Sequence, residues 1–216
     1  IVAAASIERG AAVREELTAL RAFGPLVRGV RRNLQAEPDP TFCLKPDFVA
    51  GVRLLPEFGL TFDLCIAHTQ LPPVTALVHA CPETQFILDH LGKPDVRRAE
   101  PESWRADIVR LAALPNVVCK LSGLSTEADH QQWCDDDLRP DLAHALAVFG
   151  PERVFFGSDW PVALLATEYR RWVEVLEMTM AQLSPVEQQG LWYANAHRIY
   201  GVNAPKAMAG EGAGNE

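Results

Sequence analysis

Short apolar segments alternate with longer helical ones along this sequence, and this alternation limits the fold more than any other feature. We expect strands at residues 1–5, 26–31, 61–67, 85–89, 116–121 and 153–156. Helices are expected between them, at residues 7–23, 45–58, 74–79, 103–114, 138–149 and 167–182, and two short helices close the fold. Regular alternation of this kind predicts an α/β protein with a parallel sheet. Strands that are apolar throughout, such as 154–156, are expected where both faces of a parallel sheet are covered.

A TIM-type (β/α)8 barrel is the favoured architecture. No GxGxxG or GxxxxGK[ST] motif follows any strand, which argues against a doubly wound nucleotide-binding fold. About six βα units can be counted, whereas a closed barrel has eight in roughly 200–250 residues. We therefore expect a barrel that lacks its first two units, with about 60–80 residues preceding Ile1. The domain is expected at residues 1–204, followed by a flexible Gly/Ala-rich tail at 205–216.

Composition narrows the classes of partner. The chain has 216 residues and a formal net charge of −8, and its basic residues are scattered. An acidic protein without a basic stripe is not expected to bind nucleic acid or an anionic membrane. No apolar run reaches the ~18 residues of a membrane span. The five cysteines form no CxxC pair, which is typical of reduced thiols in a cytoplasmic protein. A small molecule is the expected partner.

Polar side chains follow two of the apolar strands. Asp159 comes shortly after strand 153–156, and His90 comes directly after strand 85–89. Because chemistry in parallel α/β folds is found at the carboxyl ends of strands, these two residues are the first catalytic candidates. A carboxylate such as Asp159 suits a general base, and a neutral imidazole such as His90 suits polarisation of a carbonyl or zinc binding. The structural alternatives are a turn-capping Asp159 and a His90 bonded to a loop carbonyl.

Three further basic residues are candidates for contact with substrate. Lys93 could bind a substrate carboxylate or stabilise an oxyanion, although a solvated surface lysine is the alternative. Arg31 could clamp an anionic or hydroxylated substrate through its planar fork, and its alternative is an ion pair. Lys120 lies within a strand, so an inward-facing side chain there needs either a carboxylate partner or a role in the site.

Four motifs occur in a fixed order. They are Asp-His-Leu-Gly-Lys-Pro at 89–94, Val-Cys-Lys-Leu-Ser-Gly at 118–123, Phe-Gly-Ser-Asp-Trp-Pro at 156–161 and Asn-Ala-His-Arg-Ile-Tyr at 195–200. Together they resemble the amidohydrolase-related TIM-barrel hydrolases of the sugar-lactonase branch. That branch includes enzymes that open fuconolactone, rhamnonolactone and pyrone-dicarboxylate lactones. The resemblance extends from Ile1 to Gly201.

The sequence departs from this family at two places. The family's barrels usually open with a His-x-His pair, which this sequence lacks, and the family's Arg-His after the fourth barrel strand is here Arg31-Arg32. In the wider amidohydrolase group the position of His68 can carry a metal ligand, whereas here His68 is expected to contact substrate. The resemblance leaves two options open, namely a zinc ion held by His90 and Asp159 or a reaction without metal.

The resemblance implies a hydrolase that opens a lactone, with a sugar-acid lactone as the expected substrate. Asp159 would deprotonate water for attack on the carbonyl, and His90 would stabilise the oxyanion together with Lys93, Arg31 or a divalent metal. A metal-dependent decarboxylase of an aromatic acid on the same barrel is an alternative, and a non-catalytic remnant is another. The absence of a GxSxG motif argues against a Ser-His-Asp hydrolase.

Overall fold

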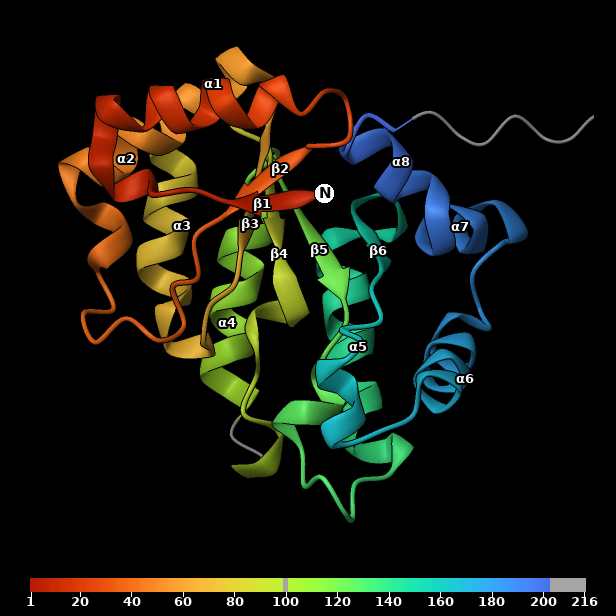
Figure 1. Cartoon of the computed structure of the whole chain (residues 1–216). Helices are drawn as coiled ribbons and strands as arrows, with labels where there is room; N and C mark the ends of the chain where they lie inside the picture. The colour runs from red at the N-terminus through yellow and green to blue at the C-terminus, as the bar shows by residue number, and fades with distance from the viewer. Residues whose placement is uncertain (99–100, 203–216) are drawn as a thin grey trace, which may run out of the picture.

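The computed structural model describes residues 1–98 and 101–202, and one sheet of parallel strands lies at its centre (Figure 1). The strands are β1 (Val2–Ala4), β2 (Gly29–Arg31), β3 (Thr61–Leu64), β4 (Phe86–Leu88), β5 (Val117–Leu121) and β6 (Val154–Phe156). They pair in the order β1-β2-β3-β4-β5-β6, so each strand lies beside the next one in the chain. This order confirms the predicted α/β fold with six strands. The tail predicted at 205–216 lies outside the described residues.

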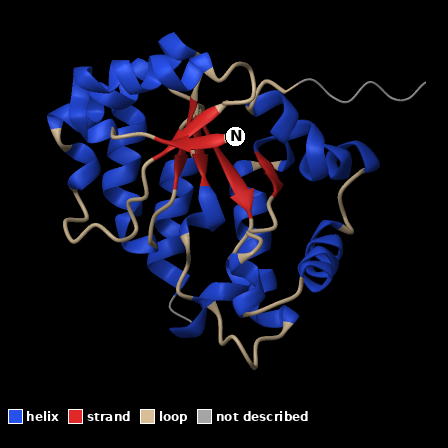
Figure 2. Cartoon of the chain, in the orientation of Figure 1, coloured by secondary structure: helices blue, strands red, loops and turns tan. Residues whose placement is uncertain are grey.

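Helices surround this sheet (Figure 2). They are α1 (Arg14–Ala22), α2 (Pro46–Leu54), α3 (Leu71–Ala80), α4 (Pro101–Ala112), α5 (Asp135–Phe149), α6 (Tyr169–Met180), α7 (Pro185–Gln189) and α8 (Asn195–Ile199). The three acidic residues 135–137 form the first turn of α5, where the helix dipole favours negative charge. Among the described residues, no helix is both long enough and apolar enough to cross a membrane.

The helix predicted at 7–23 was wrong in its first half. Residues Ile7–Val13 form a 3-10 segment that is interrupted at Gly10, which has φ 59° and ψ −132°. A Cβ atom built on Gly10 would lie 3.1 Å from Asp47 Oδ1, so a side chain here would press against α2. The α-helix therefore begins only at Arg14. The helix predicted at 45–58 likewise ends at Leu54 and continues as a 3-10 turn, Leu55–Phe58.

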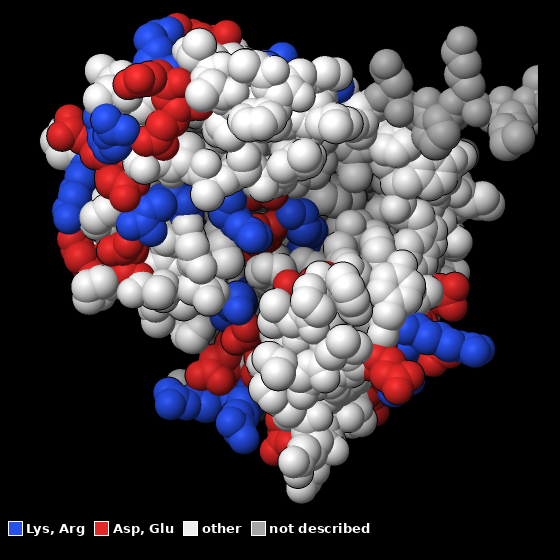
Figure 3. Space-filling view, in the orientation of Figure 1, with Lys and Arg blue, Asp and Glu red and all other residues white. Residues whose placement is uncertain are grey.

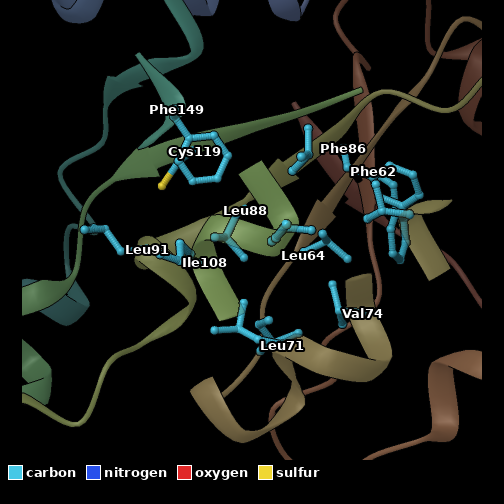
Figure 4. Packing of buried hydrophobic residues seen from close by; sticks show 14 of the residues in the cluster. Phe62, Leu64, Leu71, Val74, Phe86, Leu88, Leu91, Ile108, Cys119 and Phe149 are labelled. Carbon is cyan, nitrogen blue, oxygen red and sulfur yellow. The ribbon is translucent and has the colours of Figure 1, made fainter. Parts of the chain in front are cut away.

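Side chains alternate between the two faces of the sheet, as the two-residue period of a strand requires. Phe62, Leu64, Phe86 and Leu88 point towards the helices and form the larger hydrophobic core, part of which is drawn in Figure 4. The inner face of the sheet carries a second, smaller apolar cluster, made of Ile87, Val118 and Phe155. Both faces are thus buried, which is why strands β4 and β6 are apolar throughout.

The C-terminal helix α8 covers the inner cluster. Asn195 donates from Nδ2 to the carbonyl oxygens of Pro151 and Val154, both at 2.8 Å, and this fixes the start of α8 against the start of β6. Ala196, Ile199 and Tyr200 then pack on the inner face of the sheet. This placement brings the hydroxyl of Tyr200 to Asp63, on a strand that is distant in the sequence.

Candidate active site

The register of the sheet aligns polar residues at the carboxyl ends of neighbouring strands. Arg31 ends β2 and is level with Asp63 of β3, and Leu88 of β4 is level with Cys119 of β5. Asp89 and Lys120 are the next residues along these last two strands. The predicted candidates therefore lie together at the carboxyl end of the sheet, which is where ligands bind in parallel α/β folds.

His90 and Asp159 face each other across this end of the sheet. His90 Nε2 lies 3.7 Å from Asp159 Oδ1, which is too long for a direct hydrogen bond. The other ring nitrogen of His90, Nδ1, is 2.9 Å from Ser122 Oγ. His90 is buried and Asp159 is nearly so, with 10% and 14% of their side chains exposed. His90 is therefore oriented by Ser122, while its Nε2 atom and Asp159 Oδ1 are not hydrogen-bonded to each other.

Both residues have a backbone conformation that side chains rarely adopt. The φ angle is 54° at His90 and 54° at Asp159, and such residues are concentrated at functional sites. Gly123 lies between them: a Cβ atom built there would be 2.7 Å from His90 Nδ1 and 2.8 Å from Asp159 Oδ2. Only glycine fits this position without displacing one member of the pair.

Burial sets the charge of His90. Its desolvation lowers the pKa of the imidazole below the ordinary value, and this effect outweighs the attraction of Asp89 and Asp159 for the protonated form. His90 is therefore neutral at pH 7. When the hydroxyl of Ser122 donates to Nδ1, the single ring proton is on Nε2, the atom that faces Asp159.

Four charged residues form a network beside this pair, in which Asp63 and Asp89 are buried and about half of the Arg31 side chain is exposed. Lys120 Nζ lies 2.9 Å from Asp63 Oδ2 and 2.5 Å from Asp89 Oδ1. Arg31 donates to Asp89 Oδ2 at 3.3 Å, and the hydroxyl of Tyr200 donates to Asp63 Oδ2 at 2.7 Å. Acidic and basic groups gather in the central hollow of the face drawn in Figure 3. Lys120 thus has two carboxylate partners, Asp63 and Asp89, where the sequence required one partner or a role in the site.

Burial and mutual charge act in opposite directions within the network. Desolvation raises the pKa of Asp63, although Lys120 opposes this effect. Burial also disfavours the ammonium of Lys120, but the carboxylates of Asp63 and Asp89 outweigh it and raise the pKa of the lysine. Burial and the neighbouring Asp63 raise the pKa of the Tyr200 phenol. Lys120 consequently stays positive and Tyr200 neutral throughout the physiological range.

Lys93 and His68 lie on the loops beside the pair. Lys93 Nζ is 2.9 Å from Glu127 Oε1, so its amine is in an ion pair. His68 Nδ1 is 3.2 Å from the backbone oxygen of Lys93. Together with Glu127 and Thr126 these residues line a cavity of about 340 Å³. His68 and Lys93 are therefore in contact with each other at the loop that follows His90.

Sequence reasoning missed several residues of this arrangement. Ser122 and Gly123 end the second motif, and Tyr200 ends the fourth, but their contacts join segments that are far apart in the chain. Asp63 carried a signal that could have identified it, because it is a carboxylate between two apolar residues of a strand. Such an inward-facing charge requires a partner of opposite sign.

The described residues offer an incomplete set of metal ligands. Catalytic zinc sites use three protein ligands and a water molecule. Within residues 1–98 and 101–202, no group of three His, Cys, Asp or Glu side chains is arranged to hold a metal ion. The predicted ligands His90 and Asp159 supply two donors. This set does not fit a catalytic zinc site, and we assign no step to a metal.

Comparison with known proteins decides the family. Residues 3–202 match the amidohydrolase family. The chain belongs to this family. Over 196 residues it is 39% identical to an L-fucono-1,5-lactonase from Burkholderia multivorans, an alignment that covers 84% of this chain. The chain spans 65% of the length of that curated relative.

Solved structures agree with this assignment. An amidohydrolase from Burkholderia multivorans, crystallised with bound Zn, superimposes with a TM-score of 0.85 at 38% identity. The match covers 91% of this chain and 71% of that one. A 2,6-dihydroxybenzoate decarboxylase from Rhizobium is 14% identical, with a TM-score of 0.62, over 94% of this chain and 71% of its own. That last likeness is one of fold alone.

Proposed function

We propose that this protein is a hydrolase that opens the ring of a sugar-acid lactone. The observation that carries the proposal is the pair of His90 and Asp159, which face each other 3.7 Å apart at the carboxyl ends of the strands. A neutral imidazole beside a carboxylate provides a hydrogen-bond donor and a proton acceptor in one place. Hydrolysis of a cyclic ester requires these two functions.

The proposed reaction uses both members of the pair. Asp159 takes a proton from a water molecule, whose oxygen attacks the lactone carbonyl. The proton on His90 Nε2 is directed at the oxygen on which negative charge develops, and this stabilises the tetrahedral intermediate. The bond between the carbonyl carbon and the ring oxygen then breaks. Asp159 returns its proton to the ring oxygen, which leaves as an alcohol, and the product is a hydroxy acid.

Arg31 is the proposed contact for the substrate hydroxyl groups. Its guanidinium binds Asp89 through one nitrogen, while 48% of the side chain remains exposed at the mouth of the site. A planar fork with free N–H groups suits a polyhydroxylated ligand. Lys93 and His68 are proposed to contact the far end of the substrate from the neighbouring cavity.

The identity of a relative supports the choice of substrate. L-Fucono-1,5-lactone is the substrate in the name of the 39% identical protein, so a sugar-acid lactone is proposed here. A zinc ion is present in one related structure. His90 and Asp159 supply only two ligands, so a catalytic zinc site that included them would need a third ligand from outside the described residues. Action in the cytoplasm is proposed from the free cysteines.

The test compares two reactions on one protein. Wild type and Asp159→Asn are incubated separately with L-fucono-1,5-lactone and with 2,6-dihydroxybenzoate, and acid release and CO2 release are followed. We expect acid release from the lactone, reduced about 10²–10⁴-fold in Asp159→Asn because the general base is lost. Release of CO2 from the aromatic acid, or equal lactone rates for the two proteins, would overturn the proposal.

A further inference from the structure

The side chain of Lys120 touches both of the turns that carry the proposed catalytic pair. Its Nζ atom is 2.5 Å from Asp89 Oδ1, and Asp89 immediately precedes His90. Its aliphatic carbons lie against Gly157, which is two residues before Asp159. A Cβ atom built on Gly157 would be 2.8 Å from Lys120 Cγ and 3.0 Å from Cδ. Lys120 is therefore in direct contact with the backbone region that precedes each member of the pair.

The ammonium group of Lys120 is held in place by its partners. The carboxylates of Asp63 and Asp89 have 1% and 0% of their side chains exposed, and a buried carboxylate requires a cation. Asp63 is held in turn by the hydroxyl of Tyr200, and Asp89 by Arg31. With both ends of the side chain fixed, Lys120 cannot swing away from Gly157.

The turn that Lys120 anchors is a strained one. All four residues 90–93 have positive φ, and three of them are not glycine. Such a conformation persists only where the surroundings fix it from more than one side. On one side Trp104 donates from Nε1 to the carbonyl oxygen of Leu91 at 2.8 Å. On the other side, Asp89 is fixed by Lys120.

We infer that Lys120 is a positioning residue, which holds His90 and Asp159 at their working separation and does not itself bind the substrate. The catalytic meaning of this inference rests on the proposed function. Two of the three N–H donors of the ammonium already face carboxylates, which leaves a single donor for any ligand. The contact with Gly157 connects Lys120 to the turn that carries Asp159, just as the contact with Asp89 connects it to the turn that carries His90.

Two variants separate positioning from simple loss of charge. Gly157→Ala keeps every charge and pushes a methyl group against the stem of Lys120 and against Ser122 Cβ, 2.9 Å away. The double variant Lys120→Met/Asp63→Asn removes the bridge while leaving Asp89 opposite Arg31, so that no additional buried charge is left unpaired. Lys45→Met is the matched control, because Lys45 is exposed and lies over the ring of Phe42.

Steady-state kinetics with the lactone and ¹⁵N NMR of the His90 imidazole are the two measurements. We expect both variants to lower kcat about tenfold or more with KM within about twofold, since small displacements of reacting groups reduce the rate strongly. The Nδ1 and Nε2 signals of His90 should shift in both variants and remain unchanged in Lys45→Met.

Several results would overturn the inference. A raised KM with unchanged kcat would make Lys120 a substrate contact, and a lowered kcat with unchanged His90 signals would remove the positioning role. Unchanged kinetics and unchanged signals in folded variants would do the same. If the wild type does not open the lactone, the proposed function fails, and the NMR signals alone decide whether Lys120 positions His90.

Discussion

Replacement of Gly123 by alanine should impair catalysis far more than it impairs folding. Gly123 has φ 64°, and its Cβ would lie 2.7 Å from His90 Nδ1 and 2.8 Å from Asp159 Oδ2. To reach ordinary contact distance, those atoms must retreat by roughly 0.7 Å. A displacement approaching 1 Å between reacting groups lowers a rate by up to about 10²-fold. We therefore expect kcat/KM for the lactone to fall between about 10-fold and 100-fold.

Gly59→Ala provides the control for backbone strain. Gly59 has φ 60°, and a Cβ atom built there would meet no other atom within 4 Å. Each substitution should destabilise the protein by about 1–3 kcal/mol through the left-handed backbone alone. For a chain of this size that corresponds to a fall in Tm of about 2–4 °C per kcal/mol. If the two variants have the same Tm and Gly123→Ala loses no more activity than Gly59→Ala, the effect of Gly123 on the proposed catalytic pair is refuted.

Two further predictions concern stability. Burial lowers the pKa of folded His90 below its ordinary value of 6.5. Below about pH 6.5 the unfolded chain therefore binds a proton that the folded chain does not, and the free energy of unfolding falls as the pH drops. Urea unfolding at pH 5.5 and 7.5 should show a smaller loss of stability in His90→Asn than in wild type, and an equal loss would contradict the lowered pKa of His90. Asn195→Ala removes the amide that donates to the carbonyls of Pro151 and Val154 and should cost about 1–3 kcal/mol by denaturant unfolding. Gln132→Ala, at an exposed position, should change stability by less than about 0.5 kcal/mol.

The strands could be predicted because their signal is local. Apolar runs such as 86–88 and 154–156 reveal a sheet that is buried on both faces, and the order of the strands follows from βα alternation. The break in the first helix could not be predicted in this way. Its cause is a close approach between Gly10 and Asp47, which only the packed fold creates.

Candidate residues for the site could be chosen from the sequence, but the contacts among them could not. His90 and Asp159 follow apolar strands, and the structure brings them together. The pairing of Lys93 with Glu127, 34 residues away, and that of Tyr200 with Asp63, 137 residues away, depend on tertiary packing. Arg31 and Lys120 meet at Asp89 because β2, β4 and β5 end at the same edge of the sheet. No local sequence pattern specifies contacts between residues so far apart in the chain.

A double-mutant cycle on the proposed catalytic pair tests the central claim most directly. The kcat/KM for L-fucono-1,5-lactone is measured for wild type, His90→Asn, Asp159→Asn and the double variant. Residues that act as a unit show strongly non-additive losses. We predict that the double variant loses about as much activity as the more damaging single substitution. Losses that multiply, as for independent residues, would contradict a joint role of His90 and Asp159 in opening the lactone.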